Sequence, residues 1–154
     1  MMEVMEVMEV TSGPAFVAET TAVYGQGPRS HRDLQVHRRA FELAGEVSRL
    51  ARAFPRDEQY VLIPQLRRAA RSVHANLAEA WRKRRYEGAF IAKLSDAEAE
   101  AAETQSWLEA AKDEGYIDEA TFNHYFDRYE RLLVTIVGII SHSDKWILKP
   151  KTKA

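Results

Sequence analysis

The sequence predicts an all-α protein whose four helices form an antiparallel up-down-up-down four-helix bundle. Four stretches carry apolar residues at alternating spacings of three and four, which places one apolar seam along each helix. The connections between them are short, and this favours antiparallel neighbours. No stretch shows the period-two alternation of a half-buried strand. The seam spacing also predicts shallow left-handed crossings near about 20°.

The first helix is expected to begin near Asp33, a suitable N-cap, and to end at Pro55, which cannot continue a helix. The second runs to about Arg82, and Pro64 suits its first turn because the missing N–H would be unpaired there anyway. The first seam consists of Val36, Ala40, Leu43, Val47, Leu50 and Phe54. The second apolar sector consists of Leu66, Ala69, Ala70, Val73, Leu77 and Ala80.

The third helix is expected over residues 87–114, with Gly115 as its C′ residue. Asp118 can cap the fourth helix, which extends to about Lys145. The third seam consists of Phe90, Leu94, Ala97, Ala101, Thr104, Leu108 and Ala111. The fourth seam consists of Phe122, Phe126, Tyr129, Leu133, Ile136 and Ile140.

The composition indicates one ordinary globular domain. Residues 1–30, with a threefold MEV repeat and many small residues, read as a poorly ordered tail; the bundle occupies 31–149 and a short tail 150–154. The absence of cysteine excludes disulfides and thiolate chemistry. The longest apolar run, 132–140, is too short for a membrane span, and no basic n-region begins the chain, so we expect a cytoplasmic protein without a membrane partner.

Charge is distributed unevenly along the chain. Residues 1–30 contain one arginine and four acidic residues, a net charge of −3. Residues 31–85 contain thirteen Lys and Arg and six acidic residues, a net charge of +7. Residues 86–154 contain eight Lys and Arg and thirteen acidic residues, a net charge of −5. A basic half can pack against an acidic half, within or between subunits. Alternatively, it can present a basic face to a polyanion.

Four segments resemble a known family. They are DLQVHRRAFELAGEV, AFPRDEQYVLIPQLRRAARSVHANLAEAW, AEAEAAETQSWLEAAKDEGYI and SHSDKW. The chain looks like the four-helix bundle proteins of the 23S rRNA intervening-sequence family, to which accessory proteins of diversity-generating retroelements are related. His74 stands where that family usually has Pro, and Ala80 where it usually has Gly. The matching motif positions are Gln65, Arg67, Arg68, Ala69, Ala70, Ser72, Asn76, Ala78 and Glu79.

The resemblance implies a homo-oligomer, often a ring-shaped pentamer. It also implies RNA or DNA as a partner, because the retroelement-associated branch binds nucleic acid. For most members no activity is established.

A basic stripe and the turn after it form the candidate nucleic-acid site. Phosphate contacts from such residues give salt-dependent affinity without sequence information. The competing interpretation is a solvated face, or a surface that meets the acidic third helix of a neighbouring subunit. The residues are Arg67, Arg71, Arg82, Lys83, Arg84 and Arg85.

The remaining polar motif residues, Gln65, Arg68, Ser72, Asn76 and Glu79, are interpreted as structural. Polar side chains at a bundle boundary commonly fix helix register. We expect Glu79 to pair with an arginine of an adjacent helix or subunit.

An oligomer interface is expected where apolar residues exceed the needs of one bundle. Leu132 and Ile139 widen the fourth apolar sector, and Trp107 projects into the acidic flank of the third helix. Trp81 and Trp146 lie near helix ends, where aromatic side chains are typical interface anchors. The alternatives are that the N-terminal tail covers these residues or that they are singly exposed.

No catalytic or metal-binding pattern is recognisable. The chain has no Glu-x-x-His of di-iron bundles, no Ser/His/Asp arrangement and no Gly-rich phosphate loop, and its five histidines form no ligand pair at i, i+4. We therefore expect no enzyme activity, catalytic residue, metal or cofactor. The function predicted is that of an oligomeric bundle binding nucleic acid; the alternative is a structural oligomer or protein adaptor without a nucleic-acid role.

Overall fold

The structure, a computed structural model, describes residues 28–150 and contains four long helices. They are α3 (Gln35–Leu50), α4 (Leu62–Arg82), α5 (Glu87–Asp113) and α6 (Glu119–Ser141). Short 3-10 turns flank them: η1 (His31–Asp33), η2 (Ala51–Ala53), η3 (Arg56–Tyr60) and η4 (Ser143–Lys145). Within residues 28–150 no strand occurs, which confirms the all-α prediction. The two predicted tails fall almost entirely outside the described residues.

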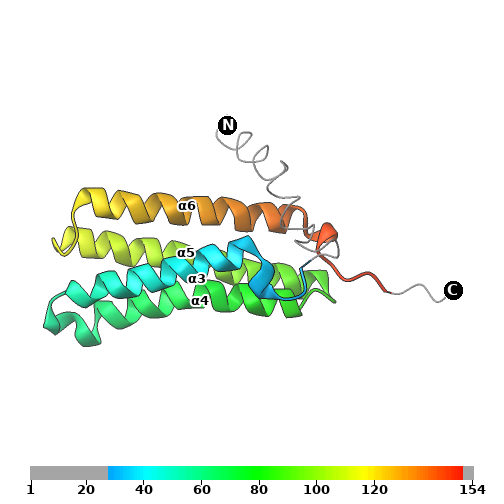
Figure 1. Cartoon of the computed structure of the whole chain (residues 1–154), viewed down its shortest axis with the longest axis horizontal. Helices are drawn as coiled ribbons and strands as arrows, with labels where there is room; N and C mark the ends of the chain where they lie inside the picture. Colours follow the sequence, from blue (N-terminus) through cyan, green and yellow to red (C-terminus); the bar gives the residue numbers. More distant parts are fainter. Residues whose placement is uncertain (1–27, 151–154) are drawn as a thin grey trace.

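Each helix runs antiparallel to the one before it, so the predicted up-down-up-down order is confirmed (Figure 1). α4 packs on both α3 and α5, and α5 also packs on α6. The first and last helices contact each other less extensively. Because the number of helices is even, the described chain begins and ends at the same end of the bundle. The turn between α4 and α5 lies at that end too.

The predicted seams of the first three helices form the core. All named residues of the α4 and α5 seams are buried, and on α3 only Leu50 is half-buried. On α6 the core is centred one residue away from the prediction: Leu132 and Ile139 are buried, whereas Leu133 and Ile140 are half-buried. Apolar residues occupy both sides of Ile136, so periodicity alone did not fix the centre of that sector.

The predicted cap of the first helix is wrong. Leu34 is the N-cap residue of α3 and makes no side-chain cap bond. Asp33 instead closes a capping box around η1, in which its Oδ2 accepts from Ser30 N at 3.2 Å and Ser30 Oγ accepts from Arg32 N at 3.2 Å. The polar pair therefore caps the short turn that precedes α3.

Three other predicted boundaries are confirmed: the start of α4, the end of α5 and the start of α6. Pro64 lies in the first turn of α4. Gly115 has φ of +79°, and the Tyr116 N–H bonds to the Ala111 carbonyl at 2.9 Å, which is the Schellman ending of a helix. Asp118 Oδ1 accepts from Thr121 N at 2.7 Å and caps α6. α3 ends at Leu50, before the predicted Pro55, and α6 ends at Ser141, before the predicted Lys145, because 3-10 turns follow both helices.

None of the helices within residues 28–150 combines the length and the apolar character that crossing a membrane requires.

Candidate nucleic-acid interface

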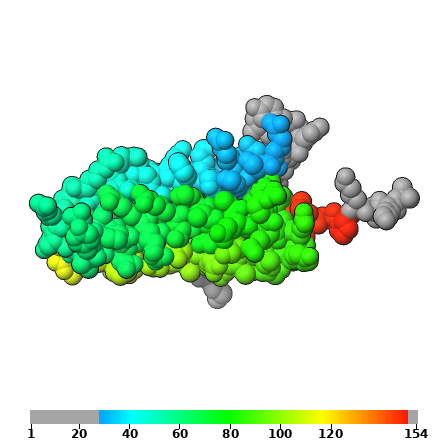
Figure 2. Space-filling view, turned by 90° about the horizontal axis from the view of Figure 1, so that it is seen from below, coloured from blue at the N-terminus to red at the C-terminus, as the bar shows by residue number. Residues whose placement is uncertain are grey.

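Four of the six predicted cations are exposed on one part of the surface, along the outer side of α4 and in the turn that follows it. Figure 2 views the molecule from a side on which α4 lies in front. None of these four side chains forms an ion pair with another residue of the described range 28–150. The four are Arg71, Arg82, Lys83 and Arg85.

Arg67 has a structural role. It is half-buried, and its Nη2 donates to the carbonyl oxygen of Ser48 at 3.0 Å, which ties α4 to α3. A guanidinium held between two helices in this way has little freedom to bind phosphate. The prediction that Arg67 belongs to the binding surface is therefore replaced by an interhelical role.

Arg84 is also part of the fold. Its guanidinium carbon lies 3.3 Å from the centre of the Trp81 ring, and its Nε donates to the Trp81 carbonyl at 2.8 Å. Burial, with a smaller contribution from Arg82, lowers the pKa of Arg84. The Arg84 carbonyl accepts from Leu148 N at 2.9 Å, so the C-terminal segment is fastened to the basic turn.

The structural motif residue Arg68 joins the basic and acidic parts within one chain. Its Nη1 lies 3.3 Å from Glu100 Oε1 of α5, and its Nη2 bonds to Glu103. The hydrogen bond from Arg68 lowers the pKa of Glu103, whose Oε1 also accepts from Trp107 Nε1 at 3.2 Å. Trp107 therefore does lie on the acidic flank, where it is half-buried.

The polar flank of α4 makes local contacts. Asn76 Nδ2 donates to the Ser72 carbonyl at 2.9 Å, one turn earlier on the same helix. Glu79 pairs with Lys93 of α5 at 2.7 Å, so its partner is a lysine of the adjacent helix and not an arginine. Gln65 is exposed.

Four of the five predicted interface residues are buried inside the single chain. Leu132 and Ile139 expose 2%, Trp81 5% and Trp146 6%. The two tryptophans fill the end of the bundle, where Trp146 stacks on Phe90 at 6.5 Å between ring centres. The interpretation that these residues are surplus to one bundle is wrong, because residues 143–148 fold back and complete the core at that end.

Two histidines near the start of α3 lie beside a third on α4 that is distant in the sequence. The ring centres of His31 and His37 are 4.7 Å apart, those of His37 and His74 are 5.7 Å apart, and Phe41 lies 5.0 Å from His74. Burial, with His31 and His74 nearby, lowers the pKa of His37 to about 4. Burial and the charge of Arg71 lower the pKa of His74. This cluster was not predicted from the sequence.

The cluster could have been found from the register of α3 on α4, that is, from which residues of the two antiparallel helices face each other. In an antiparallel pair, facing residues have a nearly constant sum of residue numbers. Phe41 and His74 share that sum with Ser48 and Arg67, whose contact fixes the α3–α4 register. Placing the two helices in that register would have brought the cluster together.

A hollow of about 340 Å³ lies between α3 and α6. Arg128 on its wall is held by Glu46 of α3, so part of its charge is already neutralised. The lining residues are Arg39, Glu42, Leu43, Arg128, Arg131 and Leu132. Within the described part of the chain, no three His, Asp or Glu residues are placed to hold a metal ion.

The fold and its basic surface define the class: an all-α four-helix bundle with a cationic face. A model of the 23S rRNA-intervening sequence protein family matches residues 32–138, so the chain belongs to that family. No curated protein matches the chain.

Among solved structures, the chain is similar to a protein of unknown function from the S23 ribosomal protein family of Bacteroides thetaiotaomicron. The two are 26% identical with a TM-score of 0.63. The match covers 69% of this chain and 95% of that one.

Proposed function

We propose that this protein acts by binding and not by catalysis, as an oligomeric four-helix bundle that holds nucleic acid on the α4 side. The observation that carries the proposal is the group of four exposed cations, Arg71, Arg82, Lys83 and Arg85, that have no acidic partner within residues 28–150. By contrast, Arg68 and Lys93 are paired with acids of the same chain: Arg68 with Glu100 and Glu103, and Lys93 with Glu79. The cations left over can contact phosphates.

The structure changes which residues should be tested. Arg67 and Arg84 make contacts that support the fold, so their replacement would confuse loss of binding with loss of structure. A fourfold variant should therefore replace only the four exposed cations by Gln. A matched control replaces four exposed cations elsewhere, Arg49, Arg52, Arg56 and Arg131, and removes the same total charge.

Fluorescence anisotropy with labelled RNA and DNA over a range of salt concentrations provides the measurement. The fourfold variant should bind every sequence more weakly, and its salt slope should fall by roughly 0.7 for each lost contact to a single strand. The control should keep most of the affinity and slope. Absence of binding by the wild type at low salt, or equal losses in variant and control, would refute the proposal.

Self-association belongs to the same proposal, with a ring of five subunits as the resemblance implies. Because Leu132 and Ile139 are buried, another surface has to form the contact. α6 offers Val137, which is 39% exposed, between the half-buried Leu133 and Ile140 at helical spacing. A ring requires this surface to meet a different surface of the next subunit.

Light scattering of the full chain tests the assembly. We expect a mass above that of the monomer, and Val137→Lys should reduce it, while the exposed Lys149→Ala should not. A monomeric wild type would refute self-association, and a dimer would refute the ring alone.

The second candidate function, a structural oligomer or protein adaptor, is favoured by the same α6 surface. It predicts assembly by light scattering without any salt-dependent binding of RNA or DNA. The two measurements together therefore separate the candidates.

A further inference from the structure

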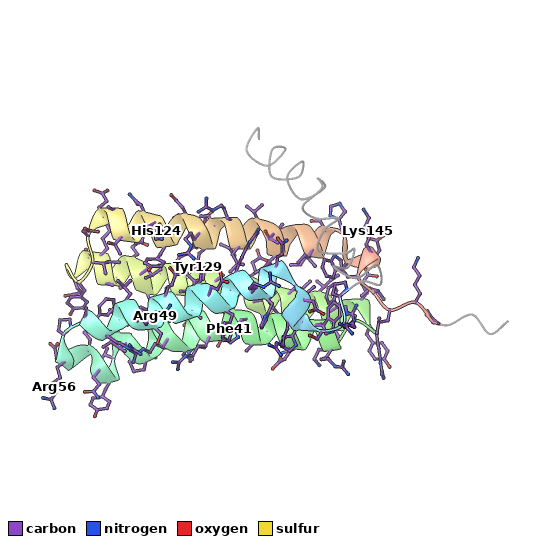
Figure 3. The ribbon with its side chains drawn as sticks, viewed as in Figure 1. Phe41, Arg49, Arg56, His124, Tyr129 and Lys145 are labelled. Atoms are coloured by element: carbon purple, nitrogen blue, oxygen red, sulfur yellow. The ribbon has the colours of Figure 1, made fainter. Side chains whose placement is uncertain are left out.

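Phe41 is an unusual residue for the surface of α3. It is 58% exposed, and it is the one large apolar side chain of α3 and α4 with that degree of exposure. Its ring lies 5.0 Å from the ring of His74 and 6.2 Å from that of His37. Figure 3 labels Phe41 on α3. The imidazoles support it from one side and leave much of its ring accessible.

The aromatic group lies within the cationic stripe. At 100° per residue, Arg71, His74 and Arg82 share one flank of α4, so His74 and the Phe41 ring beside it stand between two exposed arginines. The effect of Arg71 on the pKa of His74 agrees with this proximity. Burial lowers the pKa values of His37 and His74 and so disfavours the charged form of both rings.

We propose that Phe41, supported by His74 and His37, is a stacking platform for an unpaired base of single-stranded nucleic acid whose phosphates lie along Arg71 and Arg82. This inference rests on the proposed function and specifies its ligand. Aromatic side chains beside cations are how proteins bind single strands without sequence preference, since every base has a π-face. In a duplex the bases are already stacked and cannot reach the ring.

A second protein surface is a less suitable occupant. Stable protein interfaces have an apolar centre made of several contiguous side chains. Here one phenyl ring is exposed beside two imidazoles, on the flank of α4 that carries Arg71 and Arg82, without a second large exposed apolar side chain on either helix. This composition fits a base and its phosphates better than a helix of another subunit.

The experiment compares a labelled oligothymidylate of about 20 nucleotides with a duplex of equal length, a size that exceeds the site of one small domain. Phe41→Ala should weaken single-strand binding roughly 5- to 150-fold, the effect of losing one stacked base, and leave duplex affinity and the salt slope unchanged. Phe41→Trp should retain single-strand binding. Tyr60→Ala is the matched control, because Tyr60 is 86% exposed on η3.

The outcomes distinguish the inference from the function on which it rests. If the wild type binds neither probe, the proposed function fails. If it binds both and Phe41→Ala keeps the wild-type preference, only the stacking platform is refuted. If Phe41→Ala changes the molecular mass in light scattering, Phe41 is a protein contact and the inference is overturned. Circular dichroism confirms folding of each variant.

Discussion

Arg128 of α6 and Glu46 of α3 form a two-pronged ion pair, with Nη1–Oε1 at 2.9 Å and Nη2–Oε2 at 2.6 Å. It joins the first and last helices, which otherwise contact each other less extensively than sequential neighbours do. The hydrogen bond from Arg128 lowers the pKa of Glu46. The pair therefore fastens the side of the bundle that packing holds least.

Glu46→Gln should lower the free energy of unfolding by about 1 kcal/mol at neutral pH, because a partly exposed, well-aligned pair contributes on that scale. Since the folded-state pKa of Glu46 is depressed, this contribution is present above the ordinary carboxyl pKa and is lost as the pH falls through the folded value. Urea unfolding at neutral and acidic pH measures it. The control Glu42→Gln, an exposed neighbour on α3, should cost little; equal losses at neutral pH would contradict the assignment.

Substitutions of Arg67 and Arg71 should affect different properties, the first mainly stability and the second mainly nucleic-acid binding. Arg67→Ala removes the bond to the Ser48 carbonyl and should cost roughly 1–2 kcal/mol of unfolding free energy. Arg71→Ala, one turn along the exposed stripe, should leave stability nearly unchanged and weaken nucleic-acid binding. Denaturation and anisotropy on both variants provide the test. A destabilised Arg71 variant with an unaffected Arg67 variant would reverse these roles.

The histidine cluster should make stability depend on pH. The pKa of His37 is about 4 in the folded chain, below the ordinary 6.5, so the unfolded chain binds more protons between these values. Stability should therefore fall as the pH drops from about 6.5 toward 4. Thermal unfolding across this range checks it. His37→Gln should flatten the dependence, whereas His124→Gln, at an exposed position on α6, should not; identical pH profiles for all three proteins would disprove the cluster's role.

Substitution by alanine should change the free energy of unfolding in opposite directions at two glycines. Gly115 has a φ of +79°, which alanine adopts at a cost, so Gly115→Ala should destabilise by about 1 kcal/mol. Gly88 lies in the first turn of α5 with nothing within 4 Å of an added Cβ, so Gly88→Ala should stabilise by about 0.4–1 kcal/mol. Chemical denaturation measures both. A loss at Gly88 as large as that at Gly115 would contradict the backbone argument.

The sequence predicted the helices and most of the core because burial in a bundle follows the helical period directly. The α5 seam is an example: every named residue from Phe90 to Ala111 is buried. On α6 the helical period allowed two positions for the centre of the buried face. Only packing against the neighbouring helices buries Leu132 in preference to Leu133. The helical period gives the spacing of the buried residues along a helix. Where both sides of that row are apolar, contacts with neighbouring helices decide which side faces the core.

The site was less predictable because it depends on contacts between distant segments. Arg67 and Arg71 look alike on one helix, yet one is bonded to α3 and the other is exposed. Trp81 was expected at an interface, but Arg84 and the segment around Trp146 enclose that end of the bundle. These outcomes required the register of α3 on α4 and the path of the chain after α6.

The hydrogen bond from Leu148 N to the Arg84 carbonyl also sets an order of events during synthesis. The chain emerges from the ribosome with its N-terminal part first, so α3 and α4 are available to pair early. The basic turn, however, reaches its final conformation only after residue 148 has been made and has returned to it. Until Trp146 and Leu148 have been made, the nascent chain lacks two contacts at this end of the bundle: the stacking of Trp146 on Phe90 and the hydrogen bond to the Arg84 carbonyl.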